Sequence, residues 1–116
     1  MRIALGLALT LALVGCASMN EKRAAGPSVS LKSNKELSAL SECVFEAWQN
    51  QSLAGAHYDV SLQPLSGGGK TVVTSGQVEF ADFVKDGNGS LAKVYFQSGL
   101  MDWRKNKRVD AVKSCL

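Results

Sequence analysis

The stretch that decides the fold is residues 78–97, VEFADFVKDGNGSLAKVYFQ. Its centre, residues 86–89 (DGNG), is typical of a tight hairpin turn, because Gly and Asn adopt the positive φ angles that such turns require. The flanking runs, residues 78–85 and 91–97, are rich in the β-branched and aromatic side chains that favour strands. The stretch therefore predicts two antiparallel strands joined by a short turn.

The alternation of side chains in this hairpin predicts which ones face the core. Phe83 and Tyr95 would point outward, beside Lys85 and Lys93. Outward aromatic side chains bordered by charge can mark a partner-binding patch, but they also occur as cross-strand pairs that stabilise a hairpin. The inward set would be Val78, Phe80, Val84, Ala92, Val94 and Phe96.

Shorter strand patterns lie upstream of the hairpin. Residues 58–63 alternate apolar and polar side chains with a period of two, and residues 70–75 (KTVVTS) are rich in β-branched side chains. Pro64 and the glycines at 67–69 predict a turn between these two runs. Together with the hairpin, they predict a meander of three or four antiparallel strands.

Helical patterns flank the strands. Residues 33–36 (SNKE) have the spacing of a capping box, and an apolar stripe follows at helical spacing, which predicts a helix over residues 34–52. Past Gly99, apolar and basic side chains interleave and predict a second helix near residues 102–114. The simplest packing places both helices on one face of the sheet, so we expect one small α+β domain in the order helix, sheet, helix.

The first residues have the layout of a secretory signal peptide. A positive start at Arg2 precedes an uncharged run over residues 3–14. This run is shorter than the roughly 20 apolar residues that a membrane-spanning helix needs. We therefore expect residues 1–15 to be removed as a signal peptide.

Residues 13–16 (LVGC) resemble the lipobox of bacterial lipoproteins. The resemblance implies cleavage after Gly15 and acylation of Cys16, and several acyl chains together hold a protein on a membrane. Ala17, in place of Asp, resembles the signal for transfer to the outer membrane, facing the periplasm. The alternative is an ordinary signal peptide with an accidental cysteine, or a buried N-terminal helix. In layout the chain is similar to the small lipoproteins of proteobacterial genomes and prophages.

The segment after the lipidated cysteine has no regular pattern. Residues 16–33 show no apolar periodicity, and Gly26 followed by Pro27 interrupts any regular element. We expect a flexible tether here and a periplasmic α+β domain over residues 34–116.

The sequence contains three cysteines. If Cys16 carries lipid, it cannot form a disulfide bond, and Cys43 and Cys115 remain as a single pair. In an oxidising compartment such a pair is expected to form a disulfide bond. The alternative is two unpaired, buried thiols.

Composition and charge exclude several functions. The net charge of +3 falls to +2 when Arg2 is removed, far from the basic excess of a nucleic-acid-binding protein, so we expect no nucleic acid partner. His57 is the single histidine, and with the cysteines paired it provides no zinc site. Residues 67–70 (GGGK) lack the spacing of a phosphate loop. Glu42 and Glu46 share a helix face but are more simply solvated. We therefore expect no metal, no cofactor and no catalytic residue.

The basic run at residues 104–108 (RKNKR) is a second candidate contact surface. Arg104, Lys105, Lys107 and Arg108 could meet anionic headgroups or cell-wall carboxylates. A solvated helix face is the simpler interpretation of the same run.

These features predict a lipid-anchored envelope protein that acts by contact with another protein, as an accessory or an inhibitor, and not as an enzyme. The lipoprotein inhibitors of lysozyme are similar in size, anchor and cysteine pair, but they are all-strand barrels, whereas this domain is predicted to open with a helix. The alternative is a cell-wall-acting or other envelope enzyme whose site the sequence does not reveal.

Overall fold

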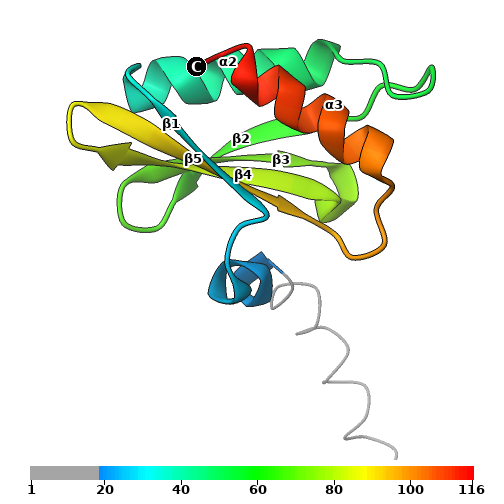
Figure 1. Cartoon of the computed structure of the whole chain (residues 1–116), viewed down its shortest axis with the longest axis horizontal. Helices are drawn as coiled ribbons and strands as arrows, with labels where there is room; N and C mark the ends of the chain where they lie inside the picture. The colour runs from blue at the N-terminus through cyan, green and yellow to red at the C-terminus, as the bar shows by residue number, and fades with distance from the viewer. Residues whose placement is uncertain (1–18) are drawn as a thin grey trace, which may run out of the picture.

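The computed structural model describes residues 19–116, so the predicted signal peptide and Cys16 lie outside the described residues. A five-stranded antiparallel sheet carries two helices on one face and a short helical segment, residues 19–25, on the other (Figure 1). We call residues 19–25 the N-terminal segment. The predicted α+β class and the placement of both helices on one face are confirmed, while the sheet has five strands and not three or four.

The strands lie in the order β1-β5-β4-β3-β2, so β2 to β5 form a meander and β1 closes the far side of β5. The helix α2 connects the two edge strands and therefore crosses the whole sheet, and α3 lies beside it (Figure 1). The elements are β1 Val29–Ser33, α2 Leu37–Asn50, β2 Val60–Leu65, β3 Gly69–Thr74, the 3-10 turn η1 Ser75–Gln77, β4 Glu79–Asp86, β5 Gly89–Phe96 and α3 Asp102–Lys113.

The strand β1 corrects the prediction of a flexible tether over residues 16–33. It pairs with β5 in a register that runs from Val29 opposite Val94 to Ser33 opposite Ser90. Val29 and Leu31 of this strand pack against the core while Ser30 and Lys32 are exposed, but two apolar side chains in five residues are too short an alternation to stand out in the sequence. The domain therefore begins well before residue 34.

The predicted capping box does not form. Ser33 ends β1, and its hydroxyl accepts a hydrogen bond from the Lys35 N–H (3.1 Å) and donates one to the Leu116 carbonyl (3.2 Å). The helix α2 begins only at Leu37, after Glu36, which makes no side-chain capping bond. The hydroxyl that was expected to cap a helix instead joins the end of β1 to Leu116, which follows α3.

The side chains of β4 face the opposite sides of the sheet from those predicted. Glu79, Ala81 and Phe83 face the helices, and Phe83 is fully buried in the core, so it does not belong to an outward patch. Phe80, predicted to face inward, lies on the other face. Both faces of β4 carry apolar side chains because both faces of the sheet are covered, so alternation alone did not distinguish them.

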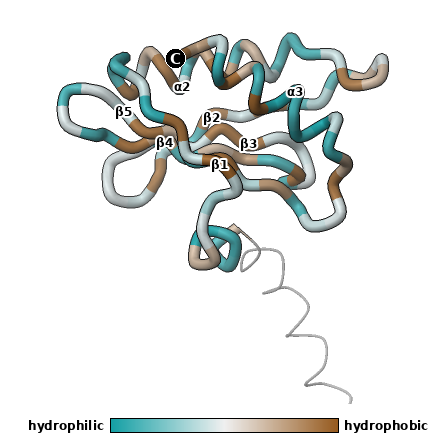
Figure 2. The backbone as a smooth tube through the Cα atoms, in the orientation of Figure 1, coloured by the Kyte–Doolittle hydropathy of each residue, from teal (hydrophilic) through white to brown (hydrophobic). Residues whose placement is uncertain are grey.

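The main core lies between the sheet and the helices. The α2 side chains Leu40, Val44 and Trp48 have no exposed surface and pack on the strands, and Figure 2 shows strongly apolar residues along the strands and a hydrophilic hairpin tip at residues 86–89. The structure contains the predicted disulfide, which joins Cys43 of α2 to Cys115 just after α3, with 5.8 Å between their Cα atoms. This bond fastens the two helices to each other.

Candidate functional site

The sheet face opposite α2 and α3 has a second, smaller apolar cluster. Phe80 and Tyr95 stack with ring centroids 4.6 Å apart and an angle of 10° between the rings. Both are buried, together with Val73 of the neighbouring strand, and Met19 packs against them. The N-terminal segment provides this cover, so the aromatic pair is a packed contact and not an open patch.

Arg23 holds the N-terminal segment on this face. Its Nε and Nη2 donate to the two carboxylate oxygens of Asp82, at 2.7 and 3.0 Å, and Nη2 also donates to the Thr71 hydroxyl at 3.3 Å. The Thr71 hydroxyl in turn donates to Asp82 Oδ1 at 2.7 Å. The guanidinium carbon lies 5.1 Å from the centroid of the Phe80 ring. A single side chain thus joins the segment to β3 and β4.

The geometry of this ion pair makes it stronger than an ordinary surface pair. The Asp82 side chain is 5% exposed and the Arg23 side chain 26% exposed. The hydrogen bond to Asp82 raises the pKa of Arg23, against an opposing effect of burial. Bidentate, charge-assisted hydrogen bonds of this kind exceed the roughly 0–1 kcal/mol of exposed ion pairs.

The Tyr95 phenol lies in the same environment. Burial raises its pKa above the ordinary value, and the negative charge of Asp82 raises it further, while Arg23 acts in the opposite direction. The neutral phenol is therefore the form that the folded protein favours.

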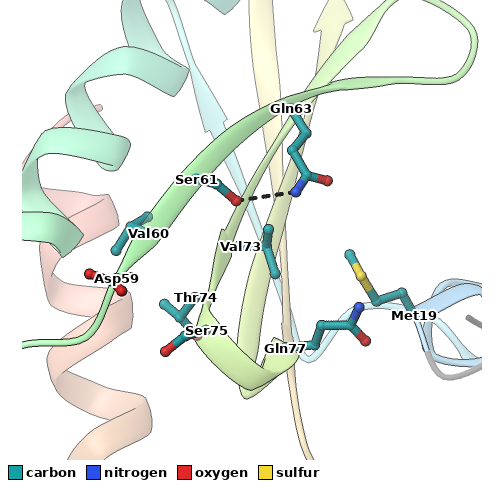
Figure 3. A pocket seen from close by; sticks show the side chains of 9 residues that line it. All are labelled: Met19, Asp59, Val60, Ser61, Gln63, Val73, Thr74, Ser75 and Gln77. Carbon is teal, nitrogen blue, oxygen red and sulfur yellow. Dashed lines mark hydrogen bonds between the residues drawn. The ribbon is translucent and has the colours of Figure 1, made fainter. Parts of the chain in front are cut away.

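A recess of about 250 Å³ lies beside this cluster, between the N-terminal segment and the β2–β3 hairpin (Figure 3). Met19, Val60 and Val73 supply its apolar part, and Asp59 is its one charged residue. Most of the remaining lining is neutral and polar, and Gln63 Nε2 donates to the Ser61 hydroxyl at 3.1 Å. The lining residues are Met19, Asp59, Val60, Ser61, Gln63, Val73, Thr74, Ser75 and Gln77.

Gln77 reaches the rim of the recess from a strained backbone. Its φ is 57°, in the left-handed region that costs a residue with a Cβ roughly 1–2 kcal/mol, and it follows Gly76 at φ 74°. In Figure 3 its amide lies beside the side chain of Met19.

Within residues 19–116, the edge of the sheet next to the recess has no strand paired to it. Ser75 N–H donates to the Asp59 carbonyl, which makes these two residues a hydrogen-bonded pair at the start of β2. Since hydrogen-bonded and non-hydrogen-bonded pairs alternate in an antiparallel ladder, the backbone groups of Val60 and Leu62 point away from β3. Pro64, which lacks an N–H, limits this edge to a short stretch.

A second polar cluster lies on the helix side and corrects the prediction for the basic run. Glu79 Oε1 accepts hydrogen bonds from Arg108 Nε at 2.8 Å and from Arg104 Nη2 at 2.9 Å. Arg108 has no exposed surface, and the Arg104 guanidinium lies 4.5 Å from the centroid of the Tyr58 ring. Arg108 is therefore removed from any contact with an anionic surface, and Arg104 is held by Glu79.

Arg108 also links α2 to α3. Its Nη1 donates to the Trp48 carbonyl at 3.0 Å and to Gln51 Oε1 at 3.2 Å, while Trp48 Nε1 donates to the Arg108 carbonyl at 3.1 Å. Burial lowers the pKa of Arg108, and the charge of Glu79 opposes that effect. These contacts indicate that Arg108 has a structural role.

The other predicted contact residues lie on separate surfaces. Lys93 and Tyr95 lie on the sheet face that carries the N-terminal segment. Lys85 is exposed near the end of β4 and belongs to the other face, which carries the helices. Lys105 and Lys107 remain at least partly exposed on α3. The predicted patch of Phe83, Tyr95, Lys85 and Lys93 is therefore divided between the two faces of the sheet.

Among residues 19–116, no three His, Cys, Asp or Glu side chains are grouped as ligands for a metal ion. None of the helices in this part of the chain has the length and apolar character of a membrane span. Comparison with protein-family models, curated proteins and solved structures finds no match to this chain.

Proposed function

We propose that this chain is a lipid-anchored protein of the bacterial envelope that acts by contact with another envelope protein, as an accessory or an inhibitor. The lipobox-like residues 13–16 support the anchor and the location, with the periplasmic side of the outer membrane as the expected place. The recess beside the N-terminal segment is the observation that supports a contact function.

The chemistry of the recess favours a polypeptide as the bound partner. Amide groups of Gln63 and Gln77 and the hydroxyl of Ser61 offer donors and acceptors without net charge, around the apolar surface of Val73. The outer edge of β2 lies next to these groups. An extended segment could pair with the outward backbone groups of this strand, as in strand addition, and place a side chain at the recess.

A site-specific crosslinking experiment tests this proposal. A photo-crosslinking amino acid at Gln63 reports on the recess, and the same amino acid at Glu46, exposed on α2, is the control. We expect one discrete envelope protein to be crosslinked from position 63 in living cells and not from position 46. Equal capture from both positions, or none from position 63, would contradict a partner at the recess.

A pair of matched substitutions separates specific binding from chance proximity. Ser61→Arg introduces a large charged side chain into the recess, whereas Ser38→Arg does so at an exposed position of α2. Both positions are exposed, so we expect both variants to fold with unchanged melting temperatures. Only Ser61→Arg should abolish the crosslink, and persistence of the crosslink in this variant would argue against the recess.

A further inference from the structure

The N-terminal segment is an ordered part of the domain and not a tether. Its helical turn ends at Gly26, whose N–H donates to the Lys22 carbonyl at 3.1 Å and to the Arg23 carbonyl at 3.3 Å. Gly26 has a φ of 103°, which turns the chain toward Pro27 and β1. The segment is therefore covalently continuous with an edge strand of the sheet.

Three strands hold the segment at separate points. Arg23 binds Asp82 of β4 and Thr71 of β3, and Lys22 Nζ donates to the Phe96 carbonyl of β5 at 3.1 Å. Met19, at the start of the segment, packs on the cluster that includes Tyr95. The segment is thus held at its start by Met19 and in its middle by Lys22 and Arg23, and its end continues through Gly26 into β1.

The chain between the proposed lipid and this segment is short. Cys16 and Met19 are separated by three peptide steps, and consecutive Cα atoms lie about 3.8 Å apart, so their Cα atoms are at most about 11 Å from each other. A flexible chain of about fifteen residues would instead extend about 20 Å on average. The attachment point of the lipid is thus confined to the neighbourhood of one sheet face.

We propose that the N-terminal segment orients the domain on the membrane, with the sheet face opposite α2 and α3 held toward the lipid headgroups. This inference rests on the proposed lipid anchor at Cys16. The helices then lie on the far side of the domain, and the recess, which Met19 lines, opens close to the bilayer surface. A partner that enters the recess would therefore approach along the membrane.

Electrostatic attraction does not explain such an orientation. The Arg23–Asp82 pair is neutral, and the remaining charges on this face and on the segment are balanced. The anchor and the segment therefore set the orientation, and we expect it on neutral as well as anionic vesicles. The cationic residues are Lys22, Lys32 and Lys93, and the acidic ones are Glu21, Asp59 and Asp86.

Short-range quenching tests the orientation with the protein purified from membranes of a producing bacterium and added to vesicles of phosphatidylethanolamine and phosphatidylglycerol. A fluorophore is attached through Ser30→Cys, exposed on the face in question, or through Ser38→Cys, exposed on α2. A fraction of the lipids carries a nitroxide on the headgroup. We expect loss of emission at position 30 and retained emission at position 38.

Two further variants show that the segment causes the orientation. Arg23→Gln removes the ion pair with Asp82, and six Gly and Ser residues inserted between Ala17 and Ser18 lengthen the connection. We expect both changes to reduce quenching at position 30. Glu21→Gln, at an exposed position of the same segment with its ion-pairing arginine retained, is the matched control and should leave quenching unchanged.

The outcomes separate this inference from the proposed function. Protein that fails to float with the vesicles would refute the lipid anchor itself. Protein that floats but is quenched equally at positions 30 and 38, or at neither, would overturn the orientation while leaving the anchor intact. Unchanged quenching with the longer connection would also overturn it.

Discussion

At the scale of single residues, the described structure contains two buried ion-pair systems on opposite faces of one sheet. Glu79 lies between two arginines on the helix side, and Asp82 binds Arg23 on the other side. Burying a charge is costly unless it is paired and hydrogen-bonded. Glu79 therefore fastens α3 to β4, and Asp82 fastens the N-terminal segment to β4. We expect the loss of either carboxylate to lower the free energy of unfolding.

Glu79→Gln removes the negative charge that faces Arg104 and Arg108. We expect it to lower the free energy of unfolding by about 3–5 kcal/mol, because a fully buried guanidinium is left without its counter-charge. Urea denaturation measures the change, with the exposed substitution Glu46→Gln as the control, expected within about 0.5 kcal/mol of the parent. A loss below about 1 kcal/mol for Glu79→Gln would show that the cluster is not structural.

We predict that the environment of Tyr95 makes the folded protein less stable at alkaline pH. Its pKa is raised in the folded protein, so the folded state keeps the phenol proton that the unfolded chain loses near pH 10. The protonated phenol of Tyr95 therefore makes its full contribution to the free energy of unfolding below about pH 10. That contribution is lost as the pH rises through the higher pKa of the folded state. Melting temperatures between about pH 8 and pH 11 should fall less in Tyr95→Phe than in Tyr58→Phe. An equal fall in both variants would contradict the environment described for Tyr95.

At the scale of elements, the contacts between segments distant in sequence decide the architecture. The disulfide joins α2 to the end of α3, β1 pairs with β5, and the N-terminal segment binds three strands. Each of these contacts joins elements that lie far apart in the sequence. The terminal elements therefore depend on a small number of identifiable bonds.

Removing the disulfide tests this dependence. The bond closes a loop with a sequence separation of 72 residues, for which loop-closure entropy gives about 4 kcal/mol. The double substitution Cys43→Ser and Cys115→Ser should lower the free energy of unfolding in urea by that order. The parent protein with added reductant should behave in the same way. A change below about 1 kcal/mol in both would show that α2 and α3 hold together without the bond.

The sequence predicted the elements whose signal is local. The turn at residues 86–89 and the apolar stripe of α2 can be recognised from spacing alone, and the pairing of Cys43 with Cys115 followed from cysteine number. The N-terminal segment could not be recognised, because its partner Asp82 lies 59 residues from Arg23 and gives no periodic pattern.

The facing of the β4 side chains was predicted wrongly because the sheet is covered on both sides. A strand covered on both faces has apolar side chains on both, so Phe80 and Phe83 were equally good candidates for the core. The buried position of Glu79 was missed because a glutamate in a strand is ordinarily exposed. The arginines at positions 104 and 108, one helical turn apart, were the available signal for a buried acidic partner.

At the scale of the whole molecule, the sheet is the middle of three layers, with α2 and α3 above it and the N-terminal segment below it (Figure 1). The third layer is the described part of the chain nearest the proposed lipid. It shapes one side of the recess through Met19 and orients the domain in our proposal. Anchoring, orientation and partner contact would then involve the same face of the protein.

The intact mass of the protein extracted from membranes of a producing bacterium tests the central claim, the lipid anchor, most directly. We predict a chain that begins at Cys16, carries acyl groups on that residue, and retains the Cys43–Cys115 disulfide. A Cys16→Ser variant should keep its leader or appear in soluble fractions. An unmodified chain that begins at any other residue would contradict the account.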